Sequence, residues 1–158
     1  QLIELYFSGL PQKVAYIINM NEDFITFAEL SPSASLSQVA ISRKEDLTSL
    51  KTNTIYLAEF GKQIEDNSLL ESAMEKISQV TEFTFEGFMA SLEKTKTIAE
   101  FTIGEESIAG RVAEHINSMI VIDEFYAEYN QRFAHSYFLV SNITKIKTIT
   151  RSVEAKNL

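Results

Sequence analysis

The residues of this sequence best suited to binding chemistry are two arginines, a histidine and two tyrosines. Arg43 and Arg111 lie near apolar stretches, where a guanidinium needs an acidic partner or an anion. His115 can accept a ligand contact or respond to pH. Tyr126 and Tyr129 are three residues apart, and buried tyrosine hydroxyls need hydrogen-bond partners. We therefore expect these five residues to line a polar pocket for a small molecule.

Each of these residues also has a structural explanation. An arginine on the surface usually pairs with a carboxylate, and a histidine among apolar residues is usually a core histidine with a satisfied hydrogen bond. The tyrosines belong to an aromatic row at helical spacing, and most such rows are core: Tyr126, Tyr129, Phe133 and Tyr137. Both explanations stay open at this point.

A search for catalytic motifs gives no candidate. The sequence has no G-x-S-x-G, no H-E-x-x-H and no phosphate-binding loop spacing. His115 and His135 would lie roughly 30 Å apart on one helix, too far to share a metal ion. Cysteine is absent, which removes thiol catalysis and thiolate metal ligands. We therefore expect no catalytic residues, no metal site, no cofactor and no enzymatic activity.

Composition narrows the classes of partner. The chain has 158 residues, 45% of them hydrophobic, which suits one folded domain with a real core. Its net charge is −8 and its basic residues are scattered, so it lacks the basic face that nucleic acids or anionic membranes require. No apolar run approaches the roughly 20 residues of a membrane span. The absence of cysteine leaves the compartment undecided.

The element that would organise these residues is a long helix from 105 to 150. Apolar residues follow one another in steps of four and three, as along a helix in a bundle or coiled coil. Two rows spaced by seven carry this pattern: Ile108, His115, Ile122, Tyr129, Ser136 and Ile143, and Val112, Met119, Tyr126, Phe133, Val140 and Lys147. No glycine or proline follows Gly110 in this stretch. Such a helix would be roughly 65 to 70 Å long.

Three further helices are expected at 1–31, 36–66 and 68–103, separated by short turns. Only two prolines and five glycines interrupt the chain, which favours long helices over a sandwich or a barrel. The sequence therefore predicts an all-α fold, an antiparallel up-down-up-down four-helix bundle with a long C-terminal helix. We found no convincing internal repeat and expect a single domain over 1–158.

One segment of the predicted long helix resembles a known family. The stretch Tyr126-Ala127-Glu128-Tyr129-Asn130-Gln131-Arg132-Phe133-Ala134 is similar to the Y-T-x-I-N-x-x-L-L segment of NIT-type (nitrate- and nitrite-sensing) helical domains. Arg111 and Ile116 precede it, as an arginine and an apolar residue do in that family. The resemblance implies a four-helix sensor domain that lies outside the membrane in bacterial chemoreceptors and histidine kinases.

These observations lead to a functional hypothesis. The chain would be the extracytoplasmic ligand-sensing domain of a transmembrane receptor, on the periplasmic or extracellular face of the inner membrane. A small molecule would bind between helices or at the interface of a homodimer, and a helix shift would pass the signal to flanking membrane spans. Both ends of the sequence look cut from a longer polypeptide, as that arrangement requires.

Two alternatives remain. The first is a helical protein–protein interaction or scaffold bundle that binds no small molecule. The second is an apolar pocket for a fatty-acid-like molecule, which eleven phenylalanines and four methionines would line.

Overall fold

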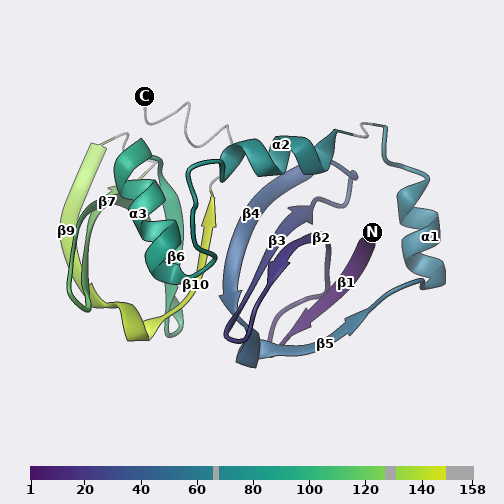
Figure 1. Cartoon of the computed structure of the whole chain (residues 1–158), viewed down its shortest axis with the longest axis horizontal. Coiled ribbons are helices and arrows are strands. Elements are labelled where there is room, and N and C mark those ends of the chain that lie inside the picture. Colours follow the sequence, from purple (N-terminus) through teal and green to yellow (C-terminus); the bar gives the residue numbers. More distant parts are fainter. Residues whose placement is uncertain (66–67, 127–130, 149–158) are drawn as a thin grey trace. The chain divides into compact units, whose positions relative to one another are not determined.

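The computed structural model describes residues 1–65, 68–126 and 131–148, and these residues form mainly β-strands (Figure 1). The described ranges contain ten strands, three short α-helices and two 3₁₀ turns. The all-α four-helix bundle predicted from the sequence is therefore wrong. The chain divides into two compact units, Gln1–Ser78 and Gln79–Leu158, which are described separately. The single domain expected over 1–158 stays a prediction.

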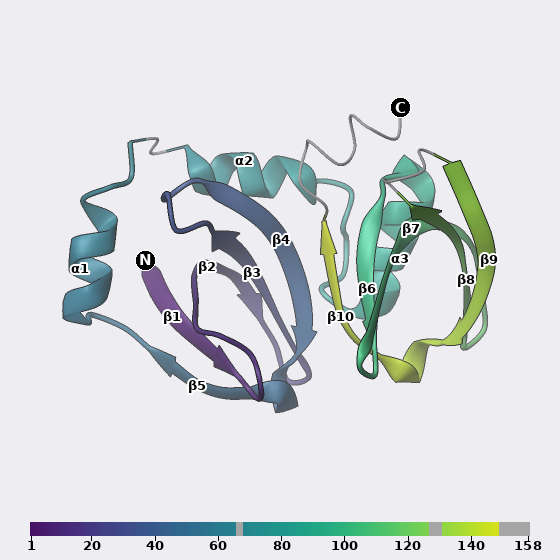
Figure 2. The ribbon, with the colours of Figure 1, turned by 180° about the vertical axis from the view of Figure 1, so that it is seen from behind.

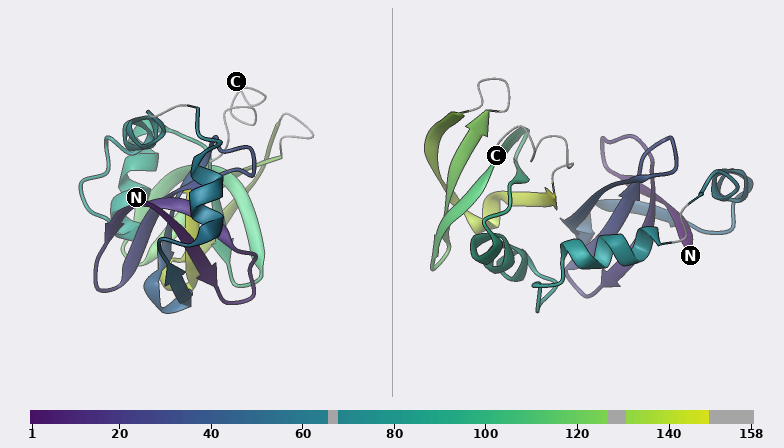
Figure 3. Two further views of the ribbon diagram at one scale, coloured as in Figure 1. Left: turned by 90° about the vertical axis from the view of Figure 1, so that its right-hand side faces the viewer. Right: turned by 90° about the horizontal axis from the view of Figure 1, so that it is seen from above.

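The first unit is an antiparallel meander of four strands whose fifth strand returns to the first. Its strand order is β5-β1-β2-β3-β4, and the strands are visibly curved (Figure 2). Helices α1 and α2 follow the last strand, and α2 packs against β4 (Figure 3). The elements are β1 (Leu2–Phe7), β2 (Lys13–Met20), β3 (Phe24–Leu30), β4 (Leu36–Arg43), η1 (Lys44–Asp46), β5 (Leu47–Lys51), α1 (Ile55–Gly61) and α2 (Leu69–Lys76).

The second unit repeats this topology after one helix, which packs against its second strand. Its strand order is β10-β6-β7-β8-β9, so the last strand again pairs with the first. The elements are α3 (Phe85–Thr95), β6 (Ala99–Ile103), β7 (Glu106–Ile116), β8 (Met119–Tyr126), β9 (Gln131–Leu139), η2 (Val140–Asn142) and β10 (Ile143–Thr148).

The repeat extends to local irregularities. In both units a three-residue 3₁₀ turn joins the fourth and fifth strands. The register between the second and third strands shifts at Ile18 in one unit and at Ala113 in the other. The register between the first and last strands shifts at Thr48 and at Thr144. Because bulges are specific features of a strand pairing, their recurrence shows that both units have one architecture.

Along the strands of the first unit, side chains that enter an inner core alternate with side chains on the opposite face. Successive residues of a strand point to opposite faces, so every second side chain can enter the core. The rings of Phe7 and Phe27 have centroids 5.6 Å apart at its centre. The buried members of this core are Ile3, Leu5, Phe7, Ala15, Ile25, Phe27 and Ala40. A second apolar cluster lies on the opposite face, where Leu57 and Phe60 of α1 and Leu69 of α2 cover Val14 and Leu30.

The long helix predicted over 105–150 is wrong. The described residues of this stretch form β7, β8, β9, η2 and β10, and the longest described helix, α3, has 11 residues. The chain reverses after β7 without glycine or proline, because Asn117 adopts the left-handed conformation at φ 55°. Asparagine tolerates that conformation better than most residues, and a two-residue hairpin turn needs it.

Two of the other three predicted helices are wrong for most of their length, and the third is interrupted and ends in a strand. Residues 1–31 form β1, β2 and β3, whereas 36–66 contain β4, β5 and only the short α1. The 68–103 stretch contains α2 and α3 but ends in β6. Gly104, directly after this range, takes φ 62° in the turn between β6 and β7.

Gly110 gives a test of the packing between β7 and β8. A Cβ atom at this position would overlap the carbonyl oxygen of Asp123 and lie 2.7 Å from Ile122 Cγ2. We expect Gly110→Ala to lower the free energy of unfolding by about 1–3 kcal/mol, measured by urea denaturation. Gly61→Ala is the control, since its Cβ would meet only Leu2 Cδ1 at 3.6 Å and alanine favours helix. Equal stability of both variants would contradict the tight β7–β8 approach.

Candidate functional site

One face of the β7–β8–β9 sheet carries three rows of side chains that point to the same side. The register places Ile116, Met119 and Leu139 in the first row, and Glu114, Val121 and Tyr137 in the second. The third row holds Arg111, Asp123 and His135. We call these nine residues the open face.

Solvent exposure separates the open face from the core. Ile120 and Ile122, which alternate with its members on β8, are fully buried. Tyr137, in contrast, is 66% exposed, Ile116 52% and Leu139 43%. Large apolar side chains therefore meet solvent in two adjacent rows.

Two of the three matched rows of the first unit are closed. The first pairs after its β2–β3 hairpin are Phe24 with Arg43, Thr26 with Ile41, and Ala28 with Val39. The last four of these residues are completely buried. Ile41 occupies the position that Tyr137 has in the second unit, so one strand position is fully covered in one unit and exposed in the other.

Charged side chains occupy the far row of the open face. His135 Nδ1 lies 2.6 Å from Asp123 Oδ1. Arg111 donates from Nε to the carbonyl oxygen of Lys96 at 2.9 Å, and its guanidinium carbon lies 5.8 Å from the centroid of the Phe125 ring. The open face is thus apolar at the β7–β8 hairpin and charged at its other end.

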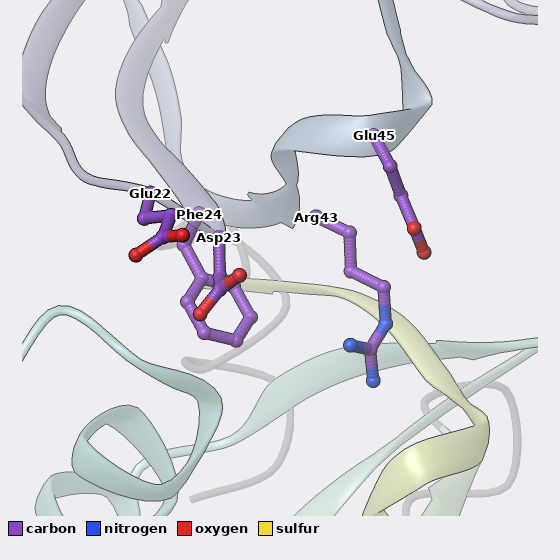
Figure 4. Close-up of a pocket in the computed structure, with 5 residues that line it drawn as sticks. All are labelled: Glu22, Asp23, Phe24, Arg43 and Glu45. Atoms are coloured by element: carbon purple, nitrogen blue, oxygen red, sulfur yellow. The ribbon is translucent and has the colours of Figure 1, made fainter.

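Arg43 lines a separate, shallow hollow of about 360 Å³ in the first unit. Figure 4 shows its side chain between Glu45 on one side and Glu22 and Asp23 on the other, with the ring of Phe24 nearby. Three carboxylates outnumber one guanidinium here, which favours a cationic group over an anion as any occupant. The predicted role of Arg43 in binding a ligand stays a prediction.

A buried carboxylate ties α1 to the first strand. Glu4 is 4% exposed and accepts hydrogen bonds from the Tyr6 hydroxyl at 3.0 Å, from the Gln12 amide and from Thr54 Oγ1 at 2.6 Å. Thr54 Oγ1 also accepts from the backbone N–H of Leu57 at 3.1 Å, which caps α1. Since three donors satisfy this carboxylate, we interpret the cluster as structural.

The remaining predicted site residues do not gather into one pocket among the described residues. His115 lies on β7 opposite Ile120, so it points to the inner face rather than to the open face. Its Nε2 is buried and has no hydrogen-bond partner within the described ranges. Tyr126 ends β8, and Tyr129 lies outside the described residues. Of the five, only Arg111 belongs to the open face.

Comparison of the chain with protein-family models, with curated proteins and with solved structures gives no match. The resemblance to NIT-type domains stays a prediction, but the helical architecture that it implied is wrong. Within the described ranges, no group of three histidine or carboxylate side chains could hold a metal ion.

The hypothesis of a helical ligand-sensing domain is wrong, and so is the alternative of a helical scaffold. Both need long helices that pack together or slide, whereas the described helices have 7, 8 and 11 residues. None of the described helices is long and apolar enough to cross a membrane. The periplasmic location, the homodimer and the small-molecule partner remain predictions.

Sequence reasoning missed the open face, although a signal was present. The segment Met119-Ile120-Val121-Ile122 is rich in β-branched residues, and Asn117-Ser118 before it suits a hairpin turn. Read as a strand, this segment puts Val121 on one face and Ile120 on the other. The exposure of Tyr137 and Leu139, however, depends on tertiary packing that no local pattern reveals.

The Glu4 cluster predicts a stability effect at Thr54. Replacement by valine removes both the cap of α1 and one hydrogen bond to a buried carboxylate, so we expect Thr54→Val to lower the free energy of unfolding by about 1–3 kcal/mol. Thr52→Val, at an exposed position two residues earlier, should change it by less than about 0.5 kcal/mol. Urea denaturation measures both. Similar values for the two variants would show that Thr54 does not anchor α1.

Tyr6 predicts a loss of stability in alkali. Burial raises the pKa of its phenol, and the hydrogen bond to Glu4, the charge of Glu4 and the charge of Tyr56 raise it further. The folded state therefore holds this proton more tightly than the unfolded chain, where the pKa is about 10. This contribution to stability is complete below about pH 10 and is lost as pH rises through the raised pKa.

The measurement compares urea unfolding of the wild type and of Tyr6→Phe from about pH 9 to about pH 11. We expect the wild type to lose more stability than the variant over this range. Tyr16, whose pKa burial also raises, is present in both proteins and cancels in the comparison. Parallel pH profiles would contradict the assignment to Tyr6.

Proposed function

We propose that this chain is a non-catalytic protein-binding module, with the open face as its binding surface. The observation that carries the proposal is the contrast between matched positions in the two units. Val39 and Ile41 are completely buried, whereas His135 and Tyr137, which occupy the matched positions in the second unit, are 54% and 66% exposed. A partner that covers the open face would give the second unit the burial that the first unit already has.

The composition of the open face supports protein binding. Exposed apolar side chains that touch one another and have a polar rim are typical of interaction surfaces. Tyr137 is both large and amphipathic, and tyrosine is enriched among the residues that dominate binding energy. The rim carries the charged side chains of Glu114 and Arg111 and the imidazole of His135, and such polar groups contribute to specificity more than to affinity.

The shape of the surface favours binding over catalysis. Catalytic groups act best in a concave, water-excluded site, where preorganised dipoles are effective. The open face is instead one side of a sheet with its largest side chains in solvent. Its histidine is 54% exposed and pairs with Asp123, but the register brings no serine, threonine or cysteine nucleophile into the nine positions.

Site-specific photo-cross-linking tests this proposal. A benzophenone amino acid at position 137, in cells that naturally produce the protein, should give a discrete cross-linked protein. The same group at Tyr56, a 51% exposed tyrosine on α1 of the first unit, should not. Leu139→Ser should lower the yield at position 137 by about tenfold, since it removes apolar contact in the next row.

Two controls make the result decisive. The Leu139→Ser protein should keep its thermal midpoint within about 2 °C, because the side chain is substantially exposed. Equal cross-linking at 137 and 56, or a yield at 137 that Leu139→Ser leaves unchanged, would remove the open face as the binding surface.

A further inference from the structure

The two units end in strands with contrasting free edges. β5 lies at one end of the first unit's strand order, and β9 lies at one end of the second unit's. Among the described residues, β5 pairs only with β1, and β9 pairs only with β8. Each therefore has one side whose backbone groups no described strand occupies. Such edges are templates for further strand pairing unless the protein blocks them.

β5 carries the usual protection against such pairing. Its register with β1 shifts at Thr48, which twists the edge, and four of its five residues are exposed. It is short, and its exposed residues include the hydroxyl side chains of Thr48 and Ser49 and the charged Lys51. Bulges, shortness and lysine are the devices by which natural edges avoid unwanted strands.

β9 lacks this protection over residues 134–139. This stretch, Ala-His-Ser-Tyr-Phe-Leu, contains no lysine, proline or carboxylate, and its register with β8 is regular. Its outward side chains alternate with its inner ones, so Tyr137 and Leu139 stand exposed along the strand. An apolar edge with a regular register is favourable for adding a strand.

We propose that the partner binds by adding an extended strand to the free edge of β9, antiparallel or parallel, and so continues the β7–β8–β9 sheet. This inference rests on the proposed function and specifies how the open face is used. Backbone hydrogen bonds to β9 supply affinity, and every second side chain of the added strand lies on the open face beside Tyr137 and Leu139. Apolar residues at alternating positions of the partner therefore match this surface.

Charge indicates which chain supplies the strand. The protein carries a net charge of −8, so two copies repel each other at long range. On the open face, the carboxylates of Glu114 in the second row and Asp123 in the third row outnumber the single guanidinium of Arg111. The complementary occupant is an extended segment of a different protein, with apolar residues at alternate positions followed by lysine or arginine next to these carboxylates.

The test selects short random peptides displayed on phage against the whole chain, with counter-selection against the Tyr137→Lys, Leu139→Lys double variant. Lysine at these exposed positions restores the protection that β5 has. We expect selected peptides to alternate apolar residues and to carry basic ones. The double variant should bind a selected peptide at least about tenfold more weakly, whereas Leu50→Lys on β5 should bind it as the wild type does.

Backbone N-methylation then distinguishes strand addition from simple contact with the face. The bound peptide has two alternating sets of amides, which we call phases. N-methylation of the phase whose N–H groups point at β9 should abolish binding, because it removes the hydrogen bonds to that strand. N-methylation of the other phase should leave binding intact. Binding should also protect from hydrogen exchange those alternate amides of residues 134–139 whose N–H groups point to the free edge. If both phases bind equally, the peptide lies on the open face without joining the sheet; strand addition is then overturned and the proposed function stands.

Two further outcomes would overturn the proposal. If no peptide is selected over the double variant, β9 is not a strand-addition site; the cross-linking result at position 137 then decides the proposed function separately. If sedimentation shows a dimer that the double variant loses, the occupant is a second copy and the assignment to a different protein is wrong. Should the lysine variant fail to fold, Tyr137→Ser and Leu139→Ser replace it, with thermal unfolding as the check.

Discussion

Each unit depends on the pairing of its last strand with its first. This contact joins residues about 45 apart in sequence, and without it the meander would be an open sheet with its inner side chains in water. In the first unit it places Glu4 opposite Lys51, and in the second it places Glu100 opposite Lys147, where the two side chains form an ion pair at 3.2 Å. The 3₁₀ turn before the last strand redirects the chain so that this return is possible. The inner cores, the hairpin registers and the open face all follow from it.

The two copies of this architecture use the same surface differently. In the first unit, the face that includes Thr26 and Ile41 is buried, and α2 packs against β4 on this unit. In the second unit, Asp123 and His135 stand where the first unit has Ala28 and Val39. Polar side chains thus replace apolar ones at a row where His135 is exposed to solvent. The two rows nearer the hairpin keep exposed apolar side chains, Ile116, Tyr137 and Leu139.

The sequence allowed only part of this to be predicted. Residues 85–95, inside the helix predicted over 68–103, are helical. The predicted ligand-binding role of Arg111 stays a prediction, and the register places this residue in the third row of the open face. The fold itself was misread because apolar residues at steps of three and four also arise where bulged strands and short turns follow one another. Asn117 was the decisive residue: a chain reversal at asparagine is invisible to a search for glycine and proline. The internal repeat escaped notice because few matched residues are identical, Glu4 and Glu100 among them.

Pairing the first strand with the last has a consequence for how such a chain can grow. Glu4, near the start of the first unit, lies directly opposite Lys51, at the end of its fifth strand, so the five-stranded sheet begins and finishes at the same place. A sheet whose two ends meet could be copied in tandem without threading the new copy through the old one. Such a copy would require only a connector between β5 and β6, where α1, α2 and α3 lie.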